Sequence, residues 1–178
     1  SRQVSNRLVK GIGFLMKKNG IDVHMGVAKL VAKDTVEVTA EDGTMISLQA
    51  KDIIVATGAS AMVPPVWEVD GEKVLTYLEA ITQEKLPESV VIIGSGAIGV
   101  EFATVWNSYG VDVTIVEMLP RIVPMEDEEV SAELTKAFKK RKIKMLTGHK
   151  VEEIENVKGA GVKITVSAGD EKKILEAE

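Results

Sequence analysis

The chain has 178 residues, of which 45% are hydrophobic and 28% are charged, with a formal net charge of −5 and no cysteine. No apolar run approaches the roughly 20 residues of a bilayer-spanning helix, and no basic face is available for the phosphates of a nucleic acid. The lack of cysteine excludes disulfides, thiolate metal sites and cysteine-based redox chemistry within these residues. Residues 1–10 show no signal-peptide pattern, so we expect a cytoplasmic protein.

The first part of the chain predicts one amphipathic helix followed by short strands. Apolar residues recur at helical spacing from Val4 to Met16, and Asn19-Gly20 supplies a stop. Strand-like runs follow at residues 22–25, 28–31, 35–39, 45–48 and 53–55. The last run is apolar throughout, which is typical of a strand that is buried on both faces. Pro64-Pro65 begins a loop, and we expect a domain boundary between residues 70 and 71.

The second part predicts alternating strands and helices. Helices are expected over residues 97–109 and 128–142, the second with Asp127 as its N-cap. Strands are expected over residues 90–93, 113–116, 143–146, 151–154 and 162–166. The order βαβαβ followed by a β-meander predicts an α/β fold with a Rossmann-like dinucleotide-binding domain.

The two parts also echo each other. The segment from Lys17 to Gly26 is similar to the segment from Lys139 to Gly148, at a constant displacement of 122 positions. This similarity predicts two copies of one unit, with chance similarity of two helix–strand pairs as the alternative. If the copies are equivalent, the glycine turn of the first copy precedes Ser1 and the last strand of the second copy follows Glu178, so we expect a chain that is cut at both ends.

A G-x-G-x-x-G turn, Gly94-Ser95-Gly96-Ala97-Ile98-Gly99, lies between an apolar strand and a helix. In this context it predicts a nicotinamide-dinucleotide site. Gly94 allows a tight turn, Gly96 lets a pyrophosphate approach the backbone, and Gly99 lets the helix pack closely on the strand. The N–H groups at the helix start would face the pyrophosphate, and the Ser95 hydroxyl could add a donor. A glycine-rich turn without a ligand is the alternative.

An acidic residue, Glu117, ends the strand that follows this helix. Its carboxylate could accept both hydroxyls of the adenosine ribose and would repel a 2′-phosphate, which favours NAD over NADP. Arg121 would instead favour NADP, but it lies four residues further on, beyond Pro120. A solvated acid at the end of a strand is the alternative reading of Glu117.

The remaining polar residues give weaker signals. On the bare sequence, Glu101 is best explained as an acid that complements a helix dipole. His24 and His149 have no acid or nucleophile at motif spacing, and we expect both to be structural. The acids at residues 126–129 are expected at a helix start without any metal, so no metal site is predicted.

Taken together, these motifs resemble those of the flavoprotein disulfide reductases with two dinucleotide-binding domains, and within that family the dihydrolipoamide dehydrogenases. The resemblance covers essentially the whole chain. It is carried by Ile53 to Gly58, by Gly94 to Glu101, by Val116-Glu117, and by Arg121 to Pro124 with Asp127.

The resemblance implies a partial FAD-binding domain in residues 1–70 and an NAD-binding domain, without its last strand, in residues 71–178. The backbone at Ala28, Ala56, Thr57 and Gly58 would line FAD. Val151 would lie against the adenine of NAD, and Ile98 and Glu101 would face the nicotinamide where it stacks on the flavin. In this family, a first glycine motif, a redox cysteine pair and a C-terminal dimerisation domain with a catalytic His–Glu pair complete the enzyme. None of these is present in the chain, so we expect no catalytic residue in it.

The implied parent enzyme oxidises dihydrolipoyl groups on an acyltransferase subunit of a 2-oxoacid dehydrogenase complex and reduces NAD. It would be a homodimer that passes electrons through a disulfide and FAD, while the 178-residue chain itself would be inactive. An NADH oxidase or a mercuric reductase of the same superfamily is one alternative. A non-catalytic NAD-binding or assembly module is another.

Overall fold

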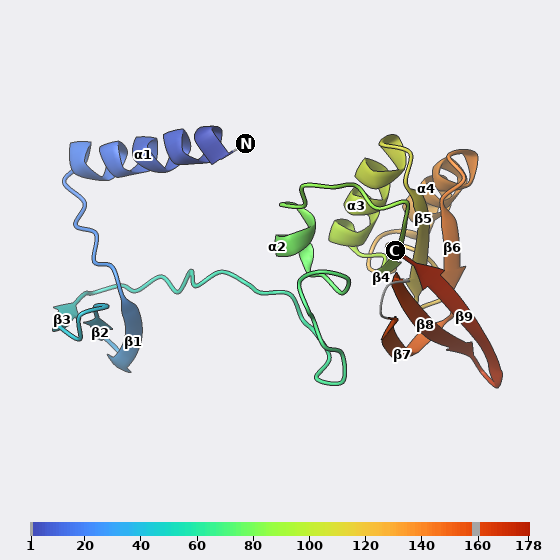
Figure 1. The fold of residues 1–178 in the computed structure, drawn as a ribbon. Helices are drawn as coiled ribbons and strands as arrows, with labels where there is room; N and C mark the ends of the chain where they lie inside the picture. Colours follow the sequence, from blue (N-terminus) through green and yellow to red (C-terminus); the bar gives the residue numbers. More distant parts are fainter. Residues whose placement is uncertain (1, 158–160) are drawn as a thin grey trace. The chain divides into compact units, whose positions relative to one another are not determined.

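A computed structural model of the chain describes residues 2–157 and 161–178. It divides into two compact units, Ser1–Ala59 and Ser60–Glu178, which are coloured blue to teal and teal-green to red in Figure 1. Each unit is described by itself. The domain boundary that the sequence predicts between residues 70 and 71 falls in a segment without helix or strand, residues 50–76.

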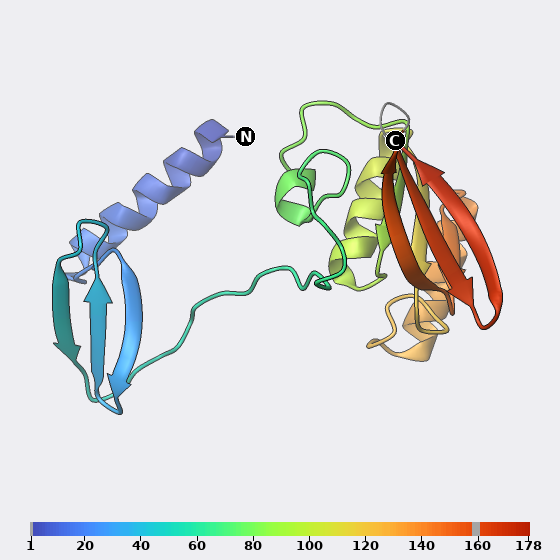
Figure 2. The same cartoon turned by 60° about the horizontal axis from the view of Figure 1, so that its bottom comes forward.

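The first unit contains one helix and one antiparallel sheet. Helix α1 (Arg2–Lys18) is followed by strands β1 (Val27–Ala32), β2 (Thr35–Thr39) and β3 (Met45–Gln49), which pair in the order β1-β2-β3 (Figure 2). In the turn between β2 and β3, the Asp42 carboxylate accepts a hydrogen bond of 2.9 Å from the Thr44 N–H. The predicted helix and three of the five strands predicted for this part of the chain are therefore confirmed.

Two predicted strands of this unit, residues 22–25 and residues 53–55, are wrong. Neither segment forms a strand, and Ile54 and Val55 are 91% and 72% exposed. A strand is stable only when a neighbouring strand satisfies its backbone hydrogen bonds, and no described strand pairs with either segment. An apolar run alone therefore did not decide the conformation.

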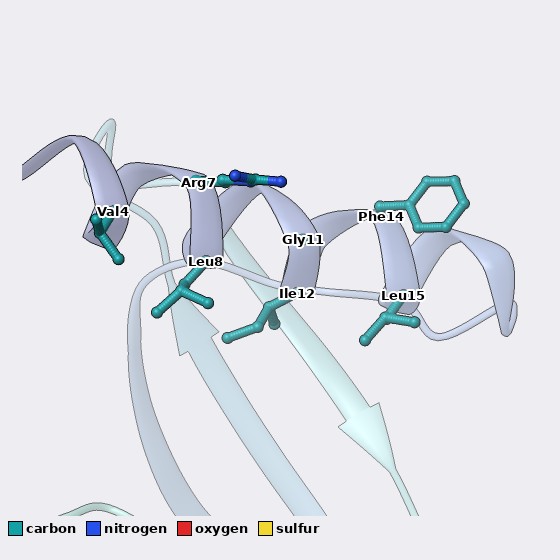
Figure 3. Close-up of a pocket in the computed structure, with 7 residues that line it drawn as sticks. All are labelled: Val4, Arg7, Leu8, Gly11, Ile12, Phe14 and Leu15. Atoms are coloured by element: carbon teal, nitrogen blue, oxygen red, sulfur yellow. The ribbon is translucent and has the colours of Figure 1, made fainter.

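One face of α1 is apolar and exposed. Val4, Leu8, Ile12 and Leu15 point to the same side of the helix, whereas Arg7 and Phe14 point away from it (Figure 3). The four apolar side chains of this face are each more than half exposed. The helical periodicity of the sequence therefore gives the helix, but no described element covers its apolar face.

The second unit is built on a parallel sheet. Strands β4 (Ser89–Ile93), β5 (Asp112–Glu117) and β6 (Lys144–Thr147) pair in parallel in the order β4-β5-β6. Helix α3 (Ala97–Ser108) connects β4 to β5, and α4 (Glu128–Lys140) connects β5 to β6. Asp127 is the N-cap of α4, as predicted, and accepts a hydrogen bond from the Glu129 N–H. The α/β architecture that the sequence predicts is confirmed for this unit.

An antiparallel sheet follows the parallel one. Strands β7 (Lys150–Val157), β8 (Gly161–Ala168) and β9 (Glu171–Ala177) pair in the order β7-β8-β9. The sequence did not predict β9, because the strand begins with three consecutive charged residues and lacks the apolar pattern of a buried strand. The last residue, Glu178, uses its carboxylate to accept a hydrogen bond from the Glu88 N–H, just before β4.

The connecting loop of this unit is tied to the antiparallel sheet by one carboxylate. Asp70 Oδ2 accepts a 2.6 Å hydrogen bond from the Asn156 amide in β7. Its other oxygen accepts bonds from three backbone N–H groups, those of Glu72, Lys73 and Val74. The loop leads to the short helix α2 (Tyr77–Ala80), whose N-cap Thr76 forms a capping box with Glu79.

Strand β5 lies between two hydrophobic cores. Val113 and Ile115 belong to the core that includes Ala103 of α3 and Phe138 of α4. Val116 belongs to a second core, formed mainly by residues of β7, β8 and β9. Because successive side chains of a strand point to opposite faces, the helices cover one face of the parallel sheet and the antiparallel sheet covers the other (Figure 2).

The repeat that the sequence suggests is also visible in how two helices end. The Ile21 N–H donates to the Met16 carbonyl at 3.0 Å, and the Ile143 N–H donates to the Phe138 carbonyl at 3.0 Å. Gly20 and Lys142 both adopt the left-handed conformation, with φ of 64° and 62°. These pairs are all separated by 122 positions, and a three-stranded antiparallel sheet follows in each unit. The structure thus supports two copies of one unit.

This equivalence predicts the effect of a substitution at Lys142. A residue other than glycine in the left-handed region costs about 1–2 kcal/mol, whereas glycine carries an entropic cost of roughly 0.5–1 kcal/mol on folding. We expect Lys142→Gly to raise the free energy of unfolding of the second unit by up to about 1 kcal/mol. Urea unfolding followed by tryptophan fluorescence measures this unit selectively, because both tryptophans, Trp67 and Trp106, belong to it.

The matched control is Lys139→Gly, which removes the same charge from within α4. It should lower the free energy of unfolding by roughly 0.5–1 kcal/mol, because glycine is a poor helix former. If Lys142→Gly destabilises the unit as much as Lys139→Gly does, the left-handed cap is not a source of strain.

Candidate dinucleotide site

The glycine turn between β4 and α3 is shaped by two glycines that the protein itself requires. Gly94 has a φ of 96°, a conformation that favours glycine, and its N–H donates to the Val116 carbonyl of β5 at 2.8 Å. A Cβ atom on Gly99 would overlap the Gly94 carbonyl oxygen and would lie 3.4 Å from Ile92 Cγ2. Helix α3 can therefore approach β4 closely only because residue 99 lacks a side chain.

The third glycine of the turn faces free space. Gly96 is the N-cap of α3 and supplies no side-chain hydrogen bond to the helix. A Cβ atom placed on it would have no atom within 4 Å. Its lack of a side chain is not needed for packing in this structure, but it leaves the first N–H groups of the helix open to an approaching group. Those N–H groups have no acceptor within the helix and carry partial positive charge.

Ser95 differs from its expected role. The residue is completely buried, and its hydroxyl donates to Glu117 Oε2 at 2.7 Å. Its N–H donates to the same oxygen at 2.9 Å, and its carbonyl accepts a 3.0 Å hydrogen bond from the Val123 N–H. A hydroxyl has a single proton to donate, so in this geometry it is not available to a pyrophosphate.

Glu117 ends β5 with its side chain turned toward the glycine turn. It is 8% exposed, and besides the two bonds from Ser95 it accepts one from the Leu119 N–H to Oε1 at 2.9 Å. Burial raises the pKa of Glu117, but the hydrogen bonds from Leu119 and Ser95 outweigh this effect, so that the pKa lies below its ordinary value. Glu117 is thus a buried, fixed carboxylate rather than a solvated acid at the end of a strand.

The hydrogen bonds that the Glu117 carboxylate already accepts limit how many more it can accept from a ligand. A carboxylate offers about four acceptor positions, and three bonds, two of them on Oε2, are already made. One position on Oε1 remains. The geometry therefore allows one further hydrogen bond, whereas the sequence suggested that both hydroxyls of a ribose could be accepted.

Arg121 is engaged in the loop that follows Glu117. Its guanidinium forms an ion pair of 2.8 Å with Glu128 Oε1 and donates to the carbonyls of Pro124 and Glu126 at 3.2 and 3.1 Å. The same loop contains Val123, a β-branched residue with an unusual φ of 41°, whose N–H donates to Ser95 as described above. The loop is thereby held against the glycine turn, and Arg121 is directed along the loop.

The other residues that the sequence singled out lie around this turn. Ala97 and Ile98 form the first turn of α3, and Ile98 is 55% exposed. Glu101 is exposed on the next turn and borders a shallow groove with Leu134 and Phe138 of the α4 region. Val151 is 8% exposed and packs in the core with Val116, so only its backbone can border a ligand.

The comparison with known proteins shows the family. Residues 2–178 match the family model described as pyridine nucleotide-disulphide oxidoreductase. This chain belongs to that family. It is 44% identical over 175 residues to a dihydrolipoyl dehydrogenase of Rhizobium etli, covering 90% of this chain and 36% of that protein. It is also 44% identical over 181 residues to a dihydrolipoyl dehydrogenase of Mycobacterium leprae, covering all of this chain and 38% of that protein.

A solved structure is also similar to this chain. The crystal structure of LpdA from Mycobacterium tuberculosis matches with a TM-score of 0.86 and 26% sequence identity, over 98% of this chain and 39% of that one. The chain thus spans somewhat more than a third of the length of these relatives. Members of the pyridine nucleotide-disulphide oxidoreductase family use FAD and NAD, and the sequence-based recognition of a dihydrolipoamide dehydrogenase relative is confirmed.

The residues that the family resemblance assigns to FAD belong to the first unit. Ala28 is an exposed residue of β1, and it pairs with Val38. Ala56, Thr57 and Gly58 are exposed and lie outside any helix or strand, with Gly58 at a φ of 78°. The structure describes these residues within their own unit, and their role in binding FAD stays a prediction.

Several groups considered for other chemistry have structural partners. His149 Nδ1 lies 2.8 Å from the Thr147 carbonyl, and of the acids at residues 126–129, Asp127 caps α4 and Glu128 pairs with Arg121. Across residues 2–157 and 161–178, no group of three or more acidic, histidine or cysteine side chains is arranged to hold a metal ion. In the same described part of the chain, no helix has the length and apolar character needed to cross a membrane.

Sequence patterns did not predict the hydrogen bonds between Ser95 and Glu117. The two residues are 22 positions apart, and no local pattern links them. The one available signal was a small hydroxyl residue at the first variable position of the glycine motif, on a turn that the fold places beside the end of the next parallel strand.

The lowered pKa of Glu117 predicts a pH effect on stability. Because the pKa in the folded state lies below the ordinary value of 4.5, the charged carboxylate stabilises the fold above about pH 4.5, and this stabilisation is lost as the pH falls through the folded pKa. Glu117→Gln should lower the free energy of unfolding at pH 7 by on the order of 1–3 kcal/mol, since an amide replaces a charged acceptor of three bonds. It should also flatten the decline in stability below pH 5.

Urea unfolding at pH 3.5 to 7, followed by tryptophan fluorescence, checks both effects. Glu133→Gln is the matched control, because Glu133 forms only an exposed ion pair with Lys136, and such pairs contribute little. Equal pH dependence in the Glu117→Gln variant and the unchanged chain would show that the carboxylate does not titrate as proposed.

Proposed function

We propose that the second unit is a Rossmann-like NAD-binding domain of a dihydrolipoyl dehydrogenase. The observation that carries the proposal is the ionised carboxylate of Glu117, fixed beside a glycine turn whose helix start is open. A dinucleotide needs an open helix N-terminus for its pyrophosphate and an acceptor near the end of the second strand for its ribose. Gly96 and Glu117 supply these two features within one βαβ unit.

The arrangement supports NAD rather than NADP. The buried negative charge of Glu117 would repel the 2′-phosphate of NADP, while its free acceptor position on Oε1 suits a ribose hydroxyl. The nearby cation, Arg121, is paired with Glu128 and with loop carbonyls. Accommodating a 2′-phosphate would therefore require breaking those bonds.

The proposed reaction belongs to the longer protein. By similarity to the dihydrolipoyl dehydrogenases, the parent enzyme would oxidise dihydrolipoyl groups on an acyltransferase subunit of a 2-oxoacid dehydrogenase complex, as a homodimer. When bound, FAD would carry electrons between a disulfide and NAD. This chain contains no cysteine, so its own proposed roles are to bind and orient NAD through Gly94 to Gly99 and Glu117, with Ile98 and Glu101 near the nicotinamide and Val151 near the adenine.

The fit of FAD to these residues is partial. Ala28 and Ala56 to Gly58 would border it through their backbone, but the sequence holds a single G-x-G-x-x-G turn, at Gly94, and that turn serves the NAD site. A dinucleotide pyrophosphate binds mainly at such a turn. The 178-residue chain should therefore not bind FAD tightly.

The NAD site is tested by substituting its acid. Glu117→Ala should weaken NADH binding by on the order of 1.5–3 kcal/mol, because the ribose loses a charged hydrogen-bond acceptor. Isothermal titration calorimetry of the 178-residue chain with NADH and with NADPH measures the change. The matched control is Glu133→Ala, an exposed acid of α4 that should leave both affinities unaltered. An unchanged NADH affinity in Glu117→Ala would defeat the assignment of the site.

The assignment to a flavoprotein is tested on the full-length gene product. Purified after expression of the whole gene, it should be yellow, and the visible absorbance of its bound flavin should bleach when NADH is added under anaerobic conditions. The result expected for a non-catalytic NAD-binding module is a colourless protein that still binds NADH. That outcome would remove the enzyme assignment while leaving the NAD site in place.

A further inference from the structure

Ser95 uses every polar group it has to join three segments of the second unit. Its N–H and its hydroxyl both donate to one oxygen of Glu117, at the end of β5. Its carbonyl accepts the N–H of Val123, in the loop that follows β5. The side chain is completely buried, so its hydroxyl has no access to solvent or to a ligand.

We propose that Ser95 is a positioning residue that sets the selectivity of the site for an unphosphorylated adenosine ribose. It acts by fixing the Glu117 carboxylate before the dinucleotide arrives. The inference rests on the proposed NAD site and deepens it, because it assigns the discrimination between NADH and NADPH to a hydrogen bond inside the protein as well as to the acid itself.

The geometry of the carboxylate supports this role. Two donors from Ser95 converge on Oε2, and the Leu119 N–H holds Oε1 from the other side. Bonds to both oxygens set the rotation of the carboxylate plane, and the Ser95 hydroxyl, as a second donor on Oε2, restrains it more tightly than one bond to each oxygen would. The remaining acceptor position then lies at a constant place on Oε1, so a ribose hydroxyl meets a ready acceptor and a 2′-phosphate meets a fixed negative charge.

In the part of the chain that the structure describes, Ser95 and Leu119 hold the Glu117 carboxylate without help from a charged neighbour. The neighbouring titratable groups are His149, which donates its backbone N–H to the Glu117 carbonyl and has its Nδ1 at the Thr147 carbonyl, and Arg121, which pairs with Glu128. Within the described residues, no charged side chain donates a hydrogen bond to the Glu117 carboxylate. Removing the Ser95 hydroxyl therefore removes one of the three donors that bond to this carboxylate.

The test compares Ser95→Ala with a matched control. Ser131→Ala also removes a buried hydroxyl from the same unit, but that hydroxyl donates to the Ile122 carbonyl at 2.7 Å and does not touch Glu117. Dissociation constants of the full 178-residue chain for NADH and for NADPH are measured by calorimetry at pH 7.5, 6.0 and 5.0. Tryptophan fluorescence and urea unfolding establish that both variants are folded.

Ser95→Ala should reduce the preference for NADH over NADPH roughly tenfold at pH 7.5, which corresponds to losing one hydrogen bond to a charged group. As the pH falls toward 5, the preference should decline earlier than in the unchanged chain, because the carboxylate is easier to protonate without the hydroxyl. Ser131→Ala should keep the original preference and the original pH profile. A change in general stability would not produce this pattern.

Two results would overturn the inference, and they are distinguishable. If Glu117→Ala abolishes the preference for NADH while Ser95→Ala stays within about twofold of the unchanged chain at every pH, the site is correct and the role of Ser95 is wrong. If the unchanged chain shows no preference for NADH over NADPH, the proposed NAD site fails together with the role of Ser95.

Discussion

The hydrogen bonds from Ser95 to Glu117 hold together the two segments that form the proposed dinucleotide site. The glycine turn begins α3, and Glu117 ends β5 on the neighbouring strand, so each belongs to a different element of the βαβ unit. The two bonds, of 2.9 and 2.7 Å, are buried and are made to a charged acceptor, which makes them stronger than bonds between neutral groups. The Gly94 N–H adds a backbone bond to Val116, next to Glu117. The spacing between the helix start and the acid is therefore fixed by the protein before any ligand binds.

This local geometry depends on the burial of β5. Val113 and Ile115 face the helices, and Val116 faces the antiparallel sheet, so the strand is anchored on both faces and paired on both edges. A strand held in this way cannot shift its register without exposing one set of apolar side chains. Glu117 directly follows Val116, so the packing of Val116 in the core also fixes the position of the Glu117 backbone. The loop after it is held in turn by Arg121 and by the bond from Val123 to Ser95.

Sequence patterns predicted the elements that depend on local or strongly periodic signals. The three long helices, the parallel strands and the Asp127 N-cap were predicted, because apolar periodicity and capping chemistry are local properties, whereas the four-residue helix α2 is too short to show a periodic pattern and was not predicted. The wrong predictions have a common cause, which is that the pairing of a segment with a neighbouring strand is not visible in its local sequence. Residues 22–25 and 53–55 have the composition of strands but lack a partner strand, and β9 has a partner but lacks an apolar pattern. The role of Ser95 was missed for a related reason, since its partner Glu117 is distant in the sequence and near only in the folded unit.

A comparison of the two copies of the repeat shows which features depend on the local sequence and which depend on neighbouring elements. Helices α1 and α4 end at equivalent residues with equivalent cap hydrogen bonds, although one cap has glycine in the left-handed conformation and the other has lysine. Beyond the caps, the copies diverge. Residues 144–147 form β6 because β5 offers them a parallel partner, while residues 22–25, at the equivalent position, form no strand. A cap closes within one helical turn, but a strand and a binding site need a neighbour. The second unit has that neighbour, and for this reason it is the unit in which Ser95 and Glu117 can meet.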